Sequence, residues 1–140
     1  MTVIDSNPAR LDIDVIHGFL ANSYWARNIP REVTERAIRN SLCYGVYDDG
    51  RQVGFARVVT DQATFAYLAD VFILESHRGR GLGKELIAAI AADERLQGLR
   101  RWVLVTRDAH KLYEPFGFSP LAAPGRYMEL HNASVYGDQR

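Results

Sequence analysis

The stretch SHRGRGLGKELIAAIAADE, from Ser76 to Glu94, decides how the rest of the chain is organised. Gly79, Gly81 and Gly83 stand at alternate positions among cations, and the run then continues with apolar residues at helical spacing. Because glycine costs backbone entropy on folding, three within five residues indicate a loop whose bare backbone is used. Successive N–H groups in such a loop, at the positive end of a helix, suit a phosphate or pyrophosphate.

The segments on either side of this stretch predict a strand, helix, strand unit. Strand-like patterns cover residues 64–75 and 100–107. Such a crossover leaves its strands parallel, with the glycine loop at the carboxyl end of the first strand, where open α/β sheets bind ligands. The other expected elements are helices over residues 12–22 and 30–40, a hairpin over 42–60 that turns at 48–50, a short helix near 108–117, a final strand pair near 118–121 and 126–131, and a loosely ordered tail after about 132.

Composition narrows the classes of protein. A chain of 140 residues that is 47% hydrophobic is the size of one domain, so we expect a single domain over residues 1–140. With 17 Lys and Arg against 17 Asp and Glu, we expect neither a nucleic acid nor a membrane partner. No stretch resembles an export signal or a membrane span, which favours a soluble, cytoplasmic protein. The histidines lack paired ligand spacing and Cys43 is the single cysteine, so we predict no metal.

Two well-known phosphate-binding motifs do not fit the loop. A P-loop needs four residues between its glycines and then Lys with Ser or Thr, but three residues separate Gly79 from Gly83, and Glu85 follows Lys84. A dinucleotide fingerprint counted from Gly79 needs a glycine where Lys84 stands. A nucleotide-binding regulator is therefore disfavoured.

The spacing Arg78-x-x-Gly81-x-Gly83 resembles the coenzyme A pyrophosphate loop of the GNAT superfamily of acyl-CoA-dependent N-acetyltransferases, Gln/Arg-x-x-Gly-x-Gly/Ala. The order of expected elements from about residue 12 to 130 resembles that family as well. The resemblance implies an α+β fold with a mixed, mostly antiparallel twisted sheet flanked by helices, and two parallel strands splayed at the acyl-CoA site. It implies transfer of acetyl from acetyl-CoA to a primary amine by direct attack in a ternary complex.

The resemblance also implies where acetyl-CoA binds. The end of the strand before the loop would offer its backbone to the pantetheine arm, and the loop amides would hold the pyrophosphate. The implied cofactor-binding residues are Val71, Phe72, Ile73, Arg78, Gly79, Arg80, Gly81, Leu82, Gly83 and Lys84. For the three cations among them, the alternative is an ordinary solvated cluster.

DAHKLYEPFGF, from Asp108 to Phe118, resembles the late helix of the family. There Tyr113 matches the tyrosine that returns a proton to the departing thiolate, and the alternative is a tyrosine packed for its ring. The family often has Asn seven residues before this tyrosine, where Thr106 stands here. Asp108, five residues before it, is our candidate replacement at the cofactor, and its alternative is an N-cap.

A base must accept a proton from the amine before or during attack. Asp70 is our candidate, because strand alternation would place it on one face with the apolar Leu68, Phe72 and Leu74. In the alternative, Asp70 only forms a hydrogen bond to a nearby loop, and water acts as the base.

Tyr24 and Trp25 would form an aromatic wall beside the acetyl group, or else lie in the core under a loop. We expect the acceptor to be a small-molecule amine rather than a protein, and the protein to be a monomer or homodimer. The rival function is a non-catalytic acyl-CoA-binding sensor on the same fold.

Overall fold

The computed structural model describes residues 1–137, and a five-stranded sheet of order β1-β2-β3-β4-β5 forms its centre. Neighbouring strands pair antiparallel, except that β5 pairs with β4 in parallel. The strands are β1 (Thr2–Asp5), β2 (Leu42–Asp48), β3 (Arg51–Thr60), β4 (Phe65–Ile73) and β5 (Arg101–Leu104). This mixed, mostly antiparallel sheet confirms the α+β fold predicted from the sequence.

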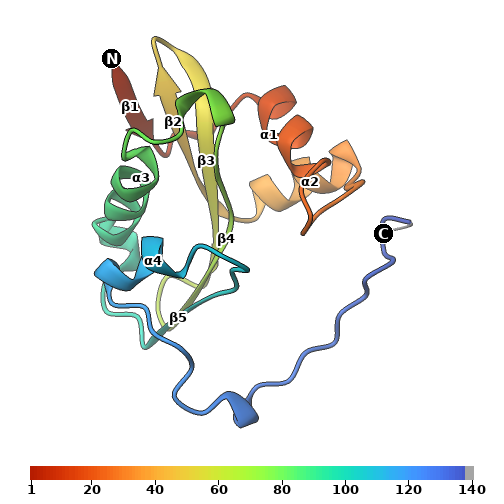
Figure 1. Ribbon diagram of the computed structural model, residues 1–140, viewed down its shortest axis with the longest axis vertical. Helices are drawn as coiled ribbons and strands as arrows, with labels where there is room; N and C mark the ends of the chain where they lie inside the picture. The colour runs from red at the N-terminus through yellow and green to blue at the C-terminus, as the bar shows by residue number, and fades with distance from the viewer. Residues whose placement is uncertain (138–140) are drawn as a thin grey trace.

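Helices cover both faces of the sheet (Figure 1). On one face lie α1 (Ile13–Leu20) and α2 (Arg31–Arg39), and on the other lie α3 (Leu82–Ala91) and the short α4 (His110–Tyr113). Asp12 caps α1, because its carboxylate accepts hydrogen bonds from two backbone N–H groups of the first turn. Both predicted N-terminal helices are therefore present, within two residues of their expected bounds.

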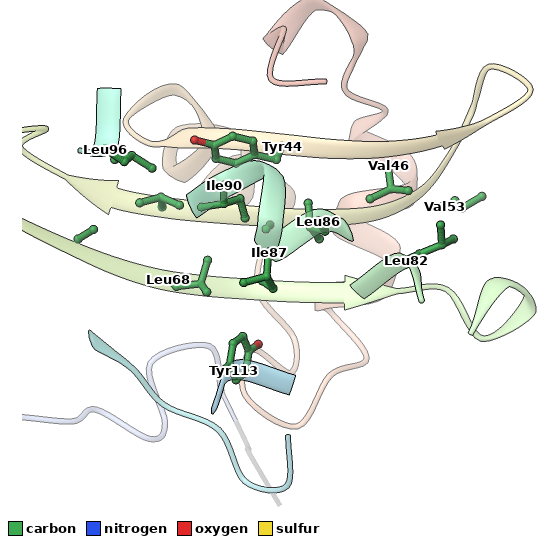
Figure 2. Packing of buried hydrophobic residues seen from close by; sticks show 13 residues of the cluster. Tyr44, Val46, Val53, Leu68, Leu82, Leu86, Ile87, Ile90, Leu96 and Tyr113 are labelled. Carbon is green, nitrogen blue, oxygen red and sulfur yellow. The ribbon is translucent and has the colours of Figure 1, made fainter. Parts of the chain in front are cut away.

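The larger hydrophobic cluster is built around α3 (Figure 2). Four α3 residues at helical spacing, each at most 5% exposed, face the sheet: Leu82, Leu86, Ile87 and Ile90. They pack against residues of β2, β3 and β4, among them Tyr44, Val46, Val53 and Leu68. The Tyr44 hydroxyl also donates a hydrogen bond to Asp93, just beyond α3, at 2.7 Å. These contacts fix α3, and with it the glycine loop at its start.

Two strands differ from expectation. We expected no strand before the two helices, but β1 is there and pairs with β2 from Thr2 opposite Asp48 to Asp5 opposite Gly45. A four-residue edge strand has too short a pattern to be recognised locally. β5 is shorter than the expected 100–107, because its pairing with β4 ends at Leu104.

A β-bulge interrupts β4 at Asp70. The register shifts opposite Phe55 and Arg57 of β3, and Asp70 has a positive φ of 55°. As a result Leu68 packs with the α3 cluster, whereas Phe72 packs with the cluster under α1 and α2. The prediction that Leu68, Asp70 and Phe72 share one face is therefore wrong, because an added residue reverses the alternation of a strand.

The expected final strand pair does not form within the described residues. After Phe118 the chain makes a 3-10 turn at Pro124–Arg126 and then runs as an extended segment apart from the sheet (Figure 1). Pro120 lacks the N–H group that a ladder requires, so the first expected strand, residues 118–121, is interrupted. Tyr136 packs against the cluster under α1. The expected loose tail reaches into residues 138–140, which lie outside the described part of the chain.

Candidate active site

β4 and β5 separate partway along their length. They pair over four positions, the last of which joins Leu68 to Leu104, and β4 continues to Ile73 with no β5 residue opposite. This divergence is the splay that the family resemblance implies. Val71, Phe72 and Ile73, the expected pantetheine contacts, lie on the unpaired part of β4. The Phe72 side chain is buried, so that residue has only its backbone to offer a ligand there.

The glycine loop joins the end of β4 to α3. Gly79 has a φ of 79° and Gly81 a φ of 77°, and a Cβ on either residue would meet no atom within 4 Å. Both positions therefore require glycine for their backbone conformation and leave open space above the loop. Gly81 is the N-cap of α3, so the first N–H groups of the helix have no partner within it. This open, positively polarised cradle fits a pyrophosphate.

Gly83 differs from Gly79 and Gly81, because its φ is not positive. It lies inside α3, and a Cβ there would touch Leu112 of α4 at 3.6 Å. The contact joins the first turn of α3 to the helix that ends in Tyr113. A contact at 3.6 Å is an ordinary van der Waals distance, so the packing at this position does not require glycine.

The three cations of the loop are exposed. The Arg78 guanidinium donates a hydrogen bond through Nε to the Ile73 carbonyl at 2.9 Å and so ties the loop to the end of β4. Arg80 and Lys84 lie beside the cradle in sequence, and their direct contact with a phosphate stays a prediction.

A hollow of about 540 Å³ opens beside the bulge of β4. Six residues that the sequence singled out line it together: Tyr24, Trp25, Asp70, Val71, Asp108 and Tyr113. They come from the loop between α1 and α2, from β4, and from the segment around α4. The fold thus gathers into one site residues as far apart in sequence as 24 and 113.

Tyr113 is only 7% exposed, and its ring meets Phe118 edge-on with centroids 5.9 Å apart. Within residues 1–137 its hydroxyl has no hydrogen-bond partner. Burial, together with nearby Tyr24, raises the pKa of Tyr113 to about 12. The phenol is thus fully protonated near neutral pH, and its proton is available to a ligand in the hollow.

Asp70 is held from two sides. Its Oδ1 accepts a hydrogen bond from Trp25 Nε1 at 2.8 Å, and its Oδ2 accepts one from Arg57 Nε at 2.8 Å. The Arg57 and Asp70 side chains are 20% and 11% exposed. The carboxylate keeps further lone pairs, so its role as the base stays a prediction.

The sequence analysis did not identify Arg57 as a residue of the site, although it lines the hollow. The signal was present, because Arg57 is the one cation inside the otherwise apolar run VGFARVV of residues 53–59. A cation in a half-buried strand needs a counter-charge, and Asp70 on the neighbouring strand supplies it.

Tyr24 and Trp25 line the hollow side by side, and their place beside an acetyl group stays a prediction. Their side chains are 50% and 41% exposed, which excludes the alternative of core residues under a loop. The two rings meet edge-on with centroids 5.1 Å apart, and the Arg107 guanidinium lies 3.9 Å from the Tyr24 ring centroid. Arg107 is a second cation of the site that the sequence did not single out.

Asp108 is exposed at the rim of the hollow. It does not cap α4, because the N-cap is Ala109, whose N–H donates to Thr106 Oγ1 at 3.0 Å. The capping alternative is therefore excluded, and the cofactor role of Asp108 stays a prediction.

Known proteins resemble this chain in sequence and in structure. A model of the acetyltransferase (GNAT) domain matches residues 39–120. FG08082 of Gibberella zeae, named as an acetyltransferase, is 33% identical over 134 residues, which cover 79% of this chain and 75% of that protein. A ycf52-like N-acetyltransferase of Prochlorococcus marinus is 33% identical over 108 residues, which cover 74% of this chain and 59% of that protein.

Solved structures extend the likeness to the whole fold. A crystal structure of a GNAT-family protein of Xanthomonas campestris pv. campestris has 47% identity and a TM-score of 0.95, covering 99% of this chain and 98% of that one. Residues 121–137 are about an eighth of the chain, so a score that high requires the same course for the extended C-terminal segment.

The fold also recurs at low identity, in a Clostridium acetobutylicum acetyltransferase crystallised with acetyl-CoA. That structure has 11% identity and a TM-score of 0.68, covering 94% of this chain and 96% of that one. The family model spans more than half of residues 1–140 and includes β4, β5, the glycine loop and Tyr113. This chain belongs to the GNAT family of acetyltransferases.

Proposed function

We propose that this protein transfers the acetyl group of acetyl-CoA to the primary amine of a small molecule, by direct attack in a ternary complex. The observation that carries the proposal is the unpartnered, protonated Tyr113 hydroxyl in a hollow beside diverging strands. The Tyr113 residue is mostly buried and yet lines the hollow, so its hydroxyl can meet a ligand there.

The chain offers acetyl-CoA a continuous path. The amides from Gly79 to Lys84 would hold the pyrophosphate, and the unpaired backbone of Val71 to Ile73 would accompany the pantetheine arm toward Tyr113. When bound, acetyl-CoA supplies an activated acyl group on a thiol that leaves as a thiolate.

The side chains of the hollow then divide the proton transfers between them. The acceptor nitrogen must be neutral to attack, so Asp70, or water beside it, takes the ammonium proton. The new carbon–nitrogen bond forms as the carbon–sulfur bond breaks, the attacking nitrogen gives its second proton to water, and Tyr113 donates its proton to the departing sulfur. The phenol recovers a proton from solvent after the products leave.

The shape of the hollow favours a small acceptor. Its volume of about 540 Å³ falls within the range typical of small-molecule sites, and Tyr24 and Trp25 form one wall. Glu129 and His131 of the C-terminal segment also line the hollow.

Two measurements in sequence test the proposal. Calorimetric titration with acetyl-CoA, CoA and ATP should give binding of the first two, and binding of ATP alone would contradict it. A panel of small primary amines, followed by detection of released thiol, should then identify at least one acceptor. Tight binding of acetyl-CoA without turnover of any amine would instead support the non-catalytic sensor.

A further inference from the structure

The glycine loop does not fix its own shape. Within residues 1–137, the N–H groups of Gly79, Arg80 and Gly81 donate no backbone hydrogen bond, and those of the first turn of α3 have no partner inside the helix. Free donors can bind an anion, but they contribute nothing to the shape of the loop before the anion arrives. The loop must therefore be held by the residues that flank it.

Arg78 holds the loop only to its own strand. The hydrogen bond from Arg78 Nε to the Ile73 carbonyl, at 2.9 Å, joins two residues that are five positions apart. Such a local bond fixes the loop relative to the end of β4, and it adds no contact with the rest of the sheet.

The His77 ring joins the same flank of the loop to the β2–β3 hairpin. His77 Nε2 lies 2.9 Å from Asp48 Oδ2, and His77 Nδ1 lies 2.7 Å from Ser76 Oγ. An ionised carboxylate only accepts hydrogen bonds, so Nε2 is the nitrogen that donates to Asp48. This hydrogen bond lowers the pKa of Asp48 and so keeps its carboxylate ionised. The His77 and Asp48 side chains are 19% and 27% exposed, so water competes with the bond only in part.

The β2–β3 hairpin is a firm base for this hydrogen bond. Asp48 is the last residue of β2, and it pairs with Thr2 on one side and with Arg51 on the other. The hairpin turns at Asp49 and Gly50, whose positive φ values of 50° and 83° suit a tight turn. The chain passes beside this hairpin on its way from β4 to α3 (Figure 1). Asp48 is therefore held on both sides, which the glycine loop is not.

We propose that His77 is a positioning residue, whose hydrogen bond to Asp48 holds the glycine loop in the shape that receives the pyrophosphate of acetyl-CoA. The proposal rests on the place proposed above for acetyl-CoA, and it does not depend on the transfer step. His77 acts through the backbone of Gly79 and Gly81, two and four residues further along the chain. A loop that already has its binding shape loses less conformational entropy when the ligand arrives, and this raises the affinity.

Charge alone predicts the opposite effect for Asp48. The phosphate groups of acetyl-CoA are negative, so an acidic side chain near the loop repels them, and its removal should strengthen binding. If Asp48 holds His77, its removal should weaken binding, because the loop loses its link to the hairpin. The sign of the change separates the two roles. The Met1 amino group lies 3.6 Å from Asp48 and 2.9 Å from Asp49, so Asp49 has a similar charge environment and serves as a control.

The first test is calorimetric titration of the full chain with acetyl-CoA, after urea titrations have shown that each variant is folded. Asp48→Ala should raise the dissociation constant about fivefold or more. Asp48→Asn should stay within about twofold of the wild type, because the Asn carbonyl can still accept from His77 Nε2. Asp49→Asn removes a neighbouring charge without a bond to the loop, and it should leave the affinity unchanged or slightly higher.

The pairing of the two residues is tested by His77→Phe, which keeps a flat ring, and by the double variant with Asp48→Ala. If the residues act as one unit, His77→Phe should weaken acetyl-CoA binding about as much as Asp48→Ala, and the double variant should bind no more weakly than either. Binding by Asp48→Ala as tight as that of the wild type or tighter, or losses that multiply in the double variant, would overturn the proposal.

A second test needs no ligand. In ¹⁵N relaxation measurements on the free protein, order parameters at Gly79 and Gly81 should be near the ~0.85 of rigid backbone in the wild type and in Asp49→Asn, and clearly lower in Asp48→Ala. Equal order in Asp48→Ala and the wild type would contradict the proposal. At saturating acetyl-CoA, kcat and the Michaelis constant for the amine should be unchanged in Asp48→Ala. A wild type that binds acetyl-CoA but acetylates no amine would count against the proposed transfer alone.

Discussion

The buried surroundings of Tyr113 determine the pKa of its hydroxyl. A phenol in water already holds its proton at neutral pH, and burial raises the pKa of Tyr113 to about 12. The group is therefore a proton donor over the whole range in which an amine acceptor becomes neutral. Because an ordinary thiol has a pKa of ~8.5, transfer of this proton to the departing thiolate is uphill, so the hydroxyl first stabilises the thiolate as a hydrogen-bond donor.

Removal of that hydroxyl alone is the first prediction. Tyr113→Phe keeps the ring contact with Phe118, so the fold and the affinity for acetyl-CoA should change little. General acid catalysis is typically worth about 10²- to 10⁴-fold, and kcat should fall within that range. Because Tyr113 stays protonated up to high pH, the two pH profiles should differ in height but not in shape between about pH 6 and pH 9. Equal kcat for both proteins would return Tyr113 to a packing role.

The Asp70 and Arg57 pair gives a second prediction. Asp70→Asn keeps the positive φ of 55°, which Asn tolerates well, and removes only the charge. Arg57 is then left half-buried without a counter-charge, so the free energy of unfolding should fall by about 1–3 kcal/mol in urea titrations. Glu75→Gln, an exposed change nearby in sequence, should cost far less.

The same variant separates the two roles of Asp70. If it is the base, kcat of the remaining folded enzyme should fall most at acidic pH, where few amines are neutral. If it only anchors Trp25, the Michaelis constant for the amine should rise while the pH profile keeps its shape.

Among the elements, the glycine loop and α3 act as one unit, because Gly81 is the N-cap of the helix. The third prediction concerns Gly81, and Gly98 provides a matched control. Gly81 and Gly98 have nearly the same backbone, with φ of 77° and 74°, and a Cβ on either would meet no atom within 4 Å. Alanine at either position should therefore cost a similar amount of stability, about 1 kcal/mol. By calorimetry, Gly81→Ala alone should weaken acetyl-CoA binding, because only Gly81 caps α3 at the cradle. Equal affinities in the two variants would exclude the cradle.

The elements that the sequence predicted well carry their own local signals. α1 begins at the Asp12 cap, and the β2–β3 hairpin turns at Asp49 and Gly50, both with positive φ. The α3 stripe repeats at helical spacing and is buried along that stripe. In each case the residues that determine the element lie within it.

The elements that the sequence mispredicted depend on distant residues. β1 exists because β2 offers an edge to Thr2–Asp5, and no local pattern announces that pairing. The bulge at Asp70 depends on the register against β3, and it reverses the side chains that follow. The segment 126–131 has a strand pattern, but no strand in the described part of the chain, residues 1–137, pairs with it.

The sequence analysis identified several residues that line the hollow, but it did not predict the contacts between them. Tyr24, Trp25, Asp70, Asp108 and Tyr113 do line one hollow. The hydrogen bonds that occupy Asp70 could not be foreseen, because Arg57 and Trp25 reach it only through the bulge and the loop between α1 and α2.

For the whole molecule, the hydrogen bond that joins Asp93, just after α3, to Tyr44 of β2 predicts how the stability of the fold depends on pH. Asp93 accepts hydrogen bonds from Arg95 and Tyr44, and Arg95 above all lowers the pKa of Asp93 from its usual 3.8. A carboxyl whose pKa is lower in the folded state contributes stability above its unfolded pKa and loses it as the pH falls below that value.

The fourth prediction follows from that sign. At pH 7, Asp93→Asn should lower the free energy of unfolding by about 1–3 kcal/mol, and the difference should shrink steadily below about pH 4. Urea titrations at intervals from pH 7 to about pH 2 would measure it. A difference that stays constant down to the lowest pH would show that Asp93 is not ionised and paired in the folded protein.

The central claim, that acetyl-CoA binds where β4 and β5 diverge and its pyrophosphate lies on the glycine loop, can be tested residue by residue. Amide chemical shifts of the ¹⁵N-labelled protein, followed during titration with acetyl-CoA, report the binding place directly. The account predicts the largest changes at Gly79 to Lys84 and at Val71 to Ile73, and almost none along β1. Changes centred elsewhere, with those amides unmoved at saturation, would contradict it.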